Sequence, residues 1–331
     1  MRLPEFEHLE PESIKEACEL LSMYKGKSKV IAGGTDLLNS MKQRLISPMY
    51  LIDIKPLPEM KGIIFDEKEG LKIGALTTHQ ELINSAVVKE KYPVLANAVS
   101  VIGSVQLQAM GTIGGNLCLN TRCWFYNQSL WWRKAREACY KLGGRVCHVV
   151  PESDKCLATY QADMAPSLIA LNAKIKLVKQ GNEKIIPLKD FYTGDGKSPL
   201  MLKEEEILTE IQVPVPVKGS GAHYEKLRLR DAIDFPLVGA AVNITLEDSG
   251  LCKEVKVIIN ALGPCPQEVV RGGEILNGRE IKEELIQELE EAAFQEARPV
   301  ETMPESIEYR KKMVKVMVKE AFQKALKTAR G

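Results

Sequence analysis

One loop segment of this chain, residues 121–160, interrupts a glycine-rich region and carries four of the eight cysteines. The four are Cys123, Cys139, Cys147 and Cys156. The sequence Gly-Thr-Ile-Gly-Gly-Asn ends at Asn116 just before the segment, and Asp163 follows just after it. Four thiolates in one loop are typical of a metal or iron–sulfur site. We therefore expect a binding unit into which this segment is inserted.

The inserted segment differs in composition from the rest of the chain. It holds seven basic and three acidic residues, a charge of +4, whereas the whole chain is +1, so the remainder is −3. All three tryptophans, Trp124, Trp131 and Trp132, lie in it. Positive charge offsets the negative charge of a thiolate cluster, and aromatic bulk limits the access of water. This composition suits an anionic centre, and equally a small apolar core that supports a long loop.

The chain as a whole gives no sign of a nucleic-acid or membrane partner. Its 45 Lys and Arg residues balance 44 Asp and Glu residues, and no run approaches the roughly eighteen apolar residues of a membrane span. The N-terminus has no apolar targeting segment, so we expect a cytoplasmic protein. Disulfides are rare there, and the cysteines are interpreted as ligands and as small buried side chains.

The hydrophobic patterns predict an α+β protein in two parts. Helices are predicted after Pro11 and at residues 37–45, 79–88, 93–103, 167–172, 279–296 and 305–329, and strands at residues 29–32, 50–54, 174–178, 184–187, 207–213, 222–229, 237–246 and 254–261. Thr78 and Glu81 have the spacing of a capping box. A Pro- and Gly-rich linker, residues 213–221, separates a binding unit, residues 1–215, from a C-terminal domain, residues 222–331.

Two glycine loops are candidates for binding an anionic ligand. Residues 32–36 (Ala-Gly-Gly-Thr-Asp) lie between a predicted strand and a predicted helix, and residues 111–116 add the Thr112 hydroxyl and the Asn116 amide. Consecutive glycines let backbone amides approach a phosphate closely. Neither loop has the G-x-G-x-x-G spacing of a Rossmann NAD site. A single such loop is ordinary in a tight turn, whereas two in one unit favour a ligand with a pyrophosphate.

These loops, Asp163 and the pattern Lys226-x-x-x-Arg230-x-x-x-Asp234-Phe235 resemble the FAD-binding medium subunit of the xanthine dehydrogenase (molybdenum hydroxylase) family over essentially the whole chain. The resemblance implies a two-subdomain FAD-binding unit of the vanillyl-alcohol-oxidase type, followed by a three-stranded sheet with helices. It also implies these FAD-binding residues: Val30, Ile31, Ala32, Gly33, Gly34, Thr35, Asp36, Leu37, Gly111, Thr112, Gly115, Asn116, Asp163, Ile207, Leu208 and Lys226. Gln108-Ala109 stands where members commonly read Arg-Asn.

Most members run almost directly from the second glycine loop to the Asp. The insertion here is similar to that of the 4-hydroxybenzoyl-CoA reductase β subunits, and this implies a [4Fe–4S] cluster on Cys123, Cys139, Cys147 and Cys156. Spacing alone leaves the metal open, because it matches neither a ferredoxin nor a zinc ribbon. Cys118 is an alternative fourth ligand, and His148 an alternative in a Cys3His zinc site. The other three cysteines are interpreted as structural: Cys18, Cys252 and Cys265.

The sequence shows no nucleophile–base pair, which fits a subunit that passes electrons while a partner carries out the substrate chemistry. The resemblance implies a small subunit with two [2Fe–2S] clusters, a large molybdopterin subunit, and ferredoxin as electron donor. It implies reductive dehydroxylation of the 4-hydroxybenzoyl-CoA type. Two alternatives stay open. One is a molybdenum hydroxylase that oxidises a purine or N-heterocycle, and the other is a zinc-stabilised docking flavoprotein.

Overall fold

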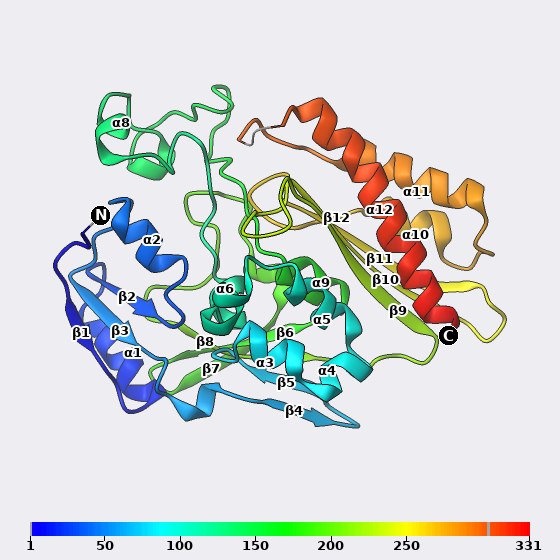
Figure 1. Ribbon diagram of the computed structural model, residues 1–331, viewed down its shortest axis with the longest axis horizontal. Helices are drawn as coiled ribbons and strands as arrows, with labels where there is room; N and C mark the ends of the chain where they lie inside the picture. The colour runs from blue at the N-terminus through cyan, green and yellow to red at the C-terminus, as the bar shows by residue number, and fades with distance from the viewer. Residues whose placement is uncertain (1, 303–304) are drawn as a thin grey trace.

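The computed structural model describes residues 2–302 and 305–331 and, within them, arranges the chain around three β-sheets (Figure 1). The first sheet is parallel, in the order β1-β3-β2, and one helix lies between each two of its successive strands along the chain. Its elements are β1 (Glu7–Leu9), α1 (Ile14–Met23), β2 (Ser28–Ile31), α2 (Leu37–Lys42) and β3 (Tyr50–Asp53). Helix α1 begins after Ser13, whose side chain accepts a hydrogen bond from the Glu16 amide. The helical spacing of Ile14, Ala17, Cys18 and Leu21 predicts the buried face, and of these Ala17, Cys18 and Leu21 are buried.

The second sheet is antiparallel, in the order β4-β5-β8-β6-β7. Its strands are β4 (Ile63–Asp66), β5 (Gly70–Gly74), β6 (Lys174–Lys179), β7 (Asn182–Pro187) and β8 (Ile207–Val213). The helices that accompany it are α3 (His79–Asn84), α4 (Ala86–Lys91), α5 (Pro93–Ser100), α6 (Val105–Met110), α7 (Ile113–Leu117) and α9 (Met164–Ala170). Leu71, Ile175 and Ile211 are fully buried in its core. Strand β8 lies between β5 and β6, so the sheet is complete only when strands far apart in sequence pair.

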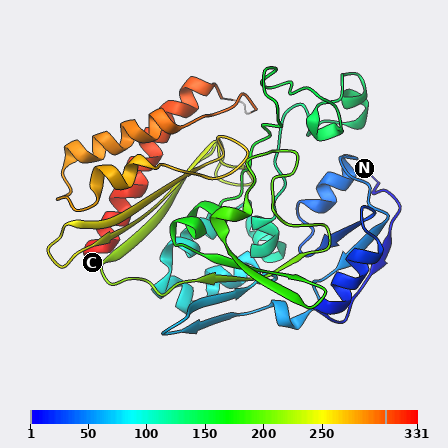
Figure 2. The same ribbon diagram turned by 180° about the vertical axis from the view of Figure 1, so that it is seen from behind.

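The third sheet, β12-β11-β10-β9, is antiparallel and carries three helices on one face (Figure 2). Its elements are β9 (Ser220–Leu227), β10 (Val238–Leu246), β11 (Cys252–Asn260), β12 (Gln267–Glu268), α10 (Arg271–Leu276), α11 (Glu283–Glu296) and α12 (Ile307–Arg330). Side chains alternate along β10. Ala240 and Val242 belong to the core under the helices, whereas Ala241 belongs to the core of the N-terminal unit. This sheet therefore joins the two parts of the chain.

The inserted segment, residues 121–160, projects as a lobe beyond the three sheets and contains α8 (Leu130–Lys134) (Figure 1). An antiparallel bridge between Arg122 and Thr159 closes its base, with two N–H···O hydrogen bonds of 2.8 Å. The buried Arg133 guanidinium donates to the carbonyls of Gln43 and Arg44, at 3.3 and 2.7 Å. The lobe is therefore attached both at its base and to the segment that follows α2.

The α+β class and the Thr78–Glu81 capping box are confirmed, and strand β8 has the predicted bounds. The predicted helix 79–88 is divided at Ser85, which ends α3 and caps α4. Sequence reasoning missed several short elements: β1, β4, β5, β12, α6, α7, α8 and α10. Such segments hold too few residues to show a period of their own. Among the described residues, no helix has the length and apolar character needed to cross a membrane.

Candidate functional site

A cavity of about 890 Å³ lies where the first two sheets, the base of the inserted segment and the C-terminal domain meet. Its volume is that of a site for a large ligand. Fourteen of the sixteen residues expected to bind a flavin line it: Val30, Ala32, Gly33, Gly34, Thr35, Asp36, Leu37, Gly111, Thr112, Gly115, Asn116, Asp163, Ile207 and Leu208. Ile31 and Lys226 are not part of the lining. Both glycine loops therefore face one space.

The first glycine loop fits against the second only because it has no side chain at Gly33. A Cβ there would lie 2.0 Å from the Met110 carbonyl oxygen, which is far inside van der Waals contact. The next residue, Gly34, has φ +71°, a left-handed conformation that side chains disfavour. Gly33 thus allows the two loops to approach each other closely, and Gly34 allows the left-handed backbone conformation. A larger residue at either position would displace the loop that forms the cavity wall.

The second glycine loop is held by α7 and by the segment after β5. The Thr112 hydroxyl accepts the Gly115 amide at 3.2 Å, and the Gly114 amide donates to the Ala75 carbonyl at 2.9 Å. A Cβ at Gly114 would lie 2.7 Å from the Ala75 Cβ. Gln108, which precedes this loop, donates from Nε2 to three carbonyls, and the shortest of these hydrogen bonds is to Ile102 at 2.8 Å. This amide braces the approach to the loop.

Asp163 lines the cavity, and two residues of the C-terminal sheet contact its carboxylate. Its carboxylate accepts hydrogen bonds from the Tyr224 hydroxyl at 2.8 Å and from the Lys226 ammonium at 2.9 Å, and both donors lie on β9. Burial raises the pKa of Asp163, and the charge of Lys226 acts in the opposite direction. Lys226 also donates to the Val101 carbonyl at 2.9 Å. Lys226 therefore does not line the cavity itself, but it pairs with Asp163, which does.

His79 is a cavity residue that sequence reasoning missed. It is the first residue of α3, is 3% exposed, and packs beside Gly111. Among the described residues, its buried Nδ1 has no hydrogen-bond partner. Burial lowers the pKa of His79 from 6.5 to about 4, so the ring is neutral at physiological pH. The sequence gives no signal for His79, because its burial at the cavity wall depends on the complete fold.

Acid should destabilise the FAD-free protein through His79. As the pH falls below 6.5, the unfolded chain takes up a proton there, but the folded protein does not until about pH 4. The unfolded state then binds more protons, so the free energy of unfolding falls by up to about 3 kcal/mol across this window. Urea unfolding of wild type and His79→Gln at neutral and mildly acidic pH measures this fall in the free energy of unfolding. Equal pH dependence in the two proteins would contradict the assignment, and His148→Gln is the control.

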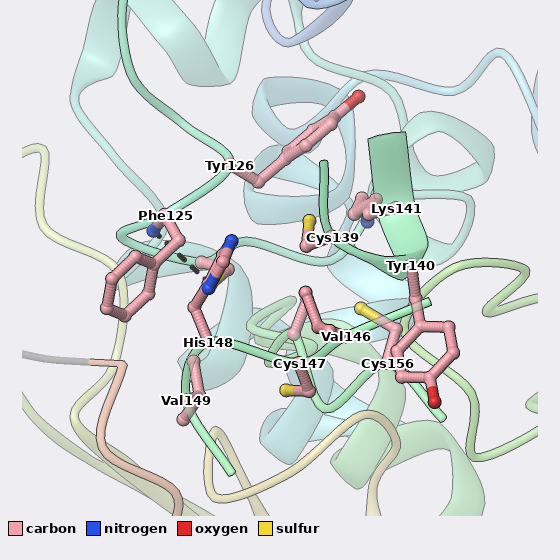
Figure 3. Close-up of a pocket in the computed structure, with 12 residues that line it drawn as sticks. Phe125, Tyr126, Cys139, Tyr140, Lys141, Val146, Cys147, His148, Val149 and Cys156 are labelled. Atoms are coloured by element: carbon pink, nitrogen blue, oxygen red, sulfur yellow. Dashed lines mark hydrogen bonds between the residues drawn. The ribbon is translucent and has the colours of Figure 1, made fainter. Parts of the chain in front are cut away.

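The four cysteines of the inserted segment line one small hollow. Cys139, Cys147 and Cys156 are buried and Cys123 is half-buried, and they share the hollow with Phe125, Tyr126 and Val146. In Figure 3 the labelled cysteines surround this hollow, with Val146 among them. Burial raises the pKa of Cys123 to about 11, so the free thiol is protonated at neutral pH. Residues spread over the whole insertion thus converge, as the sequence suggested.

The expectation of a formed metal site is not met. Within residues 2–302 and 305–331 there is no set of three or more His, Cys, Asp or Glu side chains arranged to hold a metal ion. The hollow that the thiols line has a volume of only about 10 Å³, and Val146 lines it with them. The alternative ligand Cys118 lies elsewhere, on the wall of the large cavity. His148 lines the hollow, but its Nε2 lies 2.8 Å from the Glu137 carbonyl oxygen.

A lysine cation lies at the edge of the hollow. The Lys141 ammonium donates to the Asn120 side chain at 2.8 Å, to the carbonyls of Thr121 and Gly196 at 3.0 and 2.7 Å, and to the Thr121 hydroxyl. Burial lowers the pKa of Lys141 to about 8, and the neighbouring thiols, Cys156 first, act in the opposite direction. Tyr126 lines both the hollow and the large cavity. The two spaces are therefore neighbours, and the cysteine side carries a fixed positive group.

Two family models match the chain: the FAD binding domain in molybdopterin dehydrogenase over residues 4–216, and the CO dehydrogenase flavoprotein C-terminal domain over residues 222–325. The carbon monoxide dehydrogenase medium chain of Hydrogenophaga pseudoflava is 29% identical over 323 residues, 97% of each chain. The aldehyde oxidoreductase FAD-binding subunit PaoB of Escherichia coli is 36% identical over 232 residues, 67% of this chain and 72% of that one. The solved carbon monoxide dehydrogenase of H. pseudoflava superposes with a TM-score of 0.82 at 27% identity, covering 99% of both chains.

Proposed function

The chain belongs to the family of FAD-binding subunits of molybdopterin dehydrogenases, and from this premise we propose that it is the flavin subunit of a multi-subunit molybdenum hydroxylase. The observation that carries the proposal is the cavity of about 890 Å³ between the two glycine loops. We propose as partners a large molybdopterin subunit, which carries out the substrate chemistry, and a small subunit with [2Fe–2S] clusters. The names of the relatives, a medium chain and an FAD-binding subunit, support this division.

The residues of the cavity fit FAD by their chemistry. The glycine loops at Gly33–Gly34 and Gly114–Gly115 bring backbone close to the space, which suits a pyrophosphate. The apolar side chains of Ile207 and Leu208 suit the flavin ring, and polar groups such as Asn116 suit the ribityl chain. When bound, FAD supplies exchange between two-electron and one-electron carriers. The protein binds and orients it, and we propose that the attachment is non-covalent, because neither glycine loop contains a His or Cys that could attach the flavin. Acid precipitation should therefore release it.

We further propose that the four cysteines of the inserted segment hold a [4Fe–4S] cluster. Four thiols around one hollow form the donor set of such a cluster, and Lys141 supplies positive charge beside it. The cluster requires the thiols to lose their protons and the side chains between them to move apart, a change confined to a loop closed at Arg122–Thr159. The same donor set also suits zinc, which would make the insertion a structural lobe. The metal therefore has to be measured.

We propose that the lobe receives electrons from an acidic carrier of the ferredoxin type. The segment has a charge of +4, and Trp131 on α8 is 80% exposed. Positive charge around an exposed aromatic residue favours association with an acidic partner. A reductase of the 4-hydroxybenzoyl-CoA type takes up electrons from such a carrier. We propose this substrate class because the insertion at residues 121–160 is similar to the one in those reductases. Oxidation of a purine or N-heterocycle is the alternative, since the substrate pocket lies on a partner.

Anaerobic purification of the subunit, followed by quantitation of FAD, iron, sulfide and zinc, tests these proposals together. We expect one FAD per chain, released as FAD by acid, with about four iron and four sulfide. The protein should be brown, with absorbance that underlies the flavin bands. A yellow protein with zinc and no iron would reject the cluster and leave the flavin function standing. A subunit that neither retains nor rebinds FAD would reject the flavin function itself.

A further inference from the structure

Four residues of the inserted segment line the large cavity, and one of them, Arg122, has contacts there that the cysteines do not explain. We propose that Arg122 is a flavin-binding residue supplied by the insertion, and that bound FAD in turn holds the base of the insertion in place. This inference rests on FAD occupying the cavity described above. It concerns a residue at the position before the first cysteine, whose role is separate from holding a metal.

The position of Arg122 is fixed from three sides. Its backbone pairs with Thr159 through two hydrogen bonds of 2.8 Å, at the base of the lobe. Its Nη2 forms an ion pair with the Asp36 carboxylate of the first glycine loop. Its guanidinium carbon lies 4.4 Å from the ring centre of Phe235, in the C-terminal domain. Arg122, Asp36 and Phe235 all line the cavity, so this one side chain joins three segments at its wall.

Among the described residues, the Arg122 guanidinium has one donor without an acceptor. The Nε atom of Arg122 is buried and, within the described part of the chain, has no hydrogen-bond partner. A buried donor without an acceptor is costly, and a ligand oxygen that accepts from it removes this cost. FAD offers such acceptors in its pyrophosphate and in the carbonyl groups of its ring. The Arg122 side chain lines the cavity, so its guanidinium has a donor to give to a ligand oxygen once bound FAD draws that side chain into the space.

Arg122 also changes what Asp36 does to the ligand. Asp36 follows the two glycines whose loop fits a pyrophosphate, and an unpaired carboxylate there would repel it. The ion pair with Arg122 removes this repulsion. Removing Arg122 should therefore weaken FAD binding twice, by the loss of a donor and by the exposure of a negative charge. Changing Asp36 to Asn at the same time should restore the second part.

Coupling between FAD and the insertion follows from the same contacts. If FAD binds Arg122 in its position at the base of the lobe, FAD restrains the lobe, and a restrained lobe binds FAD more tightly, by the reciprocity of linked equilibria. The tryptophans make this measurable, because Trp124, Trp131 and Trp132 all lie in the insertion. Quenching of tryptophan fluorescence by acrylamide therefore reports on the lobe alone.

The test measures the FAD dissociation constant of the full-length subunit for wild type, Arg122→Gln, Arg122→Lys and the double variant Arg122→Gln with Asp36→Asn. We expect about a 10- to 100-fold weaker affinity for Arg122→Gln, the range for a lost charge-assisted hydrogen bond. We expect a smaller loss for Arg122→Lys, which keeps the charge but not the planar donors, and partial recovery in the double variant. Arg136→Gln is the matched control, because Arg136 stacks on Trp132 within the insertion and does not line the cavity.

FAD should also reduce acrylamide quenching in wild type and in Arg136→Gln, but not in Arg122→Gln. Wild-type FAD affinity in Arg122→Gln would overturn the proposal, as would an equal loss in the Arg136→Gln control. Absence of recovery in the double variant would overturn the part that concerns Asp36. If wild type itself does not bind FAD, the failure is that of the flavin function and not of Arg122.

Discussion

Serine in place of Cys123, Cys139, Cys147 or Cys156 is expected to abolish iron binding by this subunit while leaving its FAD in place. The four thiols line one hollow that is distinct from the flavin cavity, so losing one sulfur ligand affects the cluster and not the flavin. Iron and sulfide should fall from about four per chain to near zero, because a [4Fe–4S] cluster is held by four thiolates. Metal analysis and the visible spectrum of each variant measure the loss.

The remaining cysteines provide matched controls for that series. Cys118→Ser is the most informative, because Cys118 is only five positions before Cys123 in sequence but lines the flavin cavity. We expect it to keep its iron. Cys18 and Cys252 are fully buried in the two hydrophobic cores, and their serine variants should also keep it. Loss of iron in Cys118→Ser together with its retention in Cys156→Ser would show that the ligand assignment is wrong.

Lys226→Met is expected to destabilise the folded protein by about 3–5 kcal/mol, the cost of leaving one member of a buried ion pair unpaired. The side chains of Lys226 and Asp163 are 2% and 5% exposed, so the carboxylate loses its counter-charge without gaining water. The Tyr224 hydroxyl continues to donate to it. Urea unfolding followed by circular dichroism gives the free energy of unfolding. FAD affinity should fall as well, because Asp163 lines the cavity.

The Lys226→Met effect should depend on pH with a defined sign. Without Lys226, burial raises the pKa of Asp163 further above the ordinary value of 3.8. Between that value and the raised one, the folded state binds more protons than the unfolded state, so the free energy of unfolding falls as the pH rises. The deficit relative to wild type should thus be larger at neutral pH than in mild acid. A deficit independent of pH would show that Asp163 is not the group responsible.

Lys324→Met is the matched control for this pair. Lys324 also forms an ion pair with a carboxylate on β9, that of Glu225, but its side chain is 53% exposed. Exposed ion pairs contribute about 1 kcal/mol or less, so this variant should stay close to wild type. A similar loss in both variants would show that the effect of Lys226→Met comes from general damage to β9 and not from the buried charge.

Local patterns in the sequence were sufficient where neighbours along the chain decide the structure. The capping box of Thr78 and Glu81, the buried face of α1 and the bounds of β8 depend on residues close in sequence, and they were predicted. The two glycine loops were also recognised, because consecutive glycines between apolar runs are a local signal. The long helix expected at residues 79–88 was divided in the structure, since Ser85 competes with the helix by capping α4.

Only part of the candidate site could be predicted from such local patterns. Residue types indicated the glycine loops and the cysteines, but not which side chains meet. His79 became part of the cavity wall through burial beside Gly111, and Arg122 came to line the cavity in contact with Asp36 and Phe235, residues separated from it by long stretches of chain. The sequence also placed Cys118 and Cys123 as near neighbours, whereas the fold assigns them to different spaces. No local pattern carries such information.

By itself, the sequence determined the α+β class, the two glycine loops and a separate, basic, cysteine-rich insertion, because composition and short-range periodicity report on local backbone preferences. Tertiary structure decided that both loops face one cavity, that Lys226 pairs with Asp163, and that the four thiols line one small hollow together with side chains such as Val146. The physical reason is that a site forms where distant segments pack. The position of each side chain there depends on the pairing of strands such as β5, β8 and β6, which only the complete fold brings together.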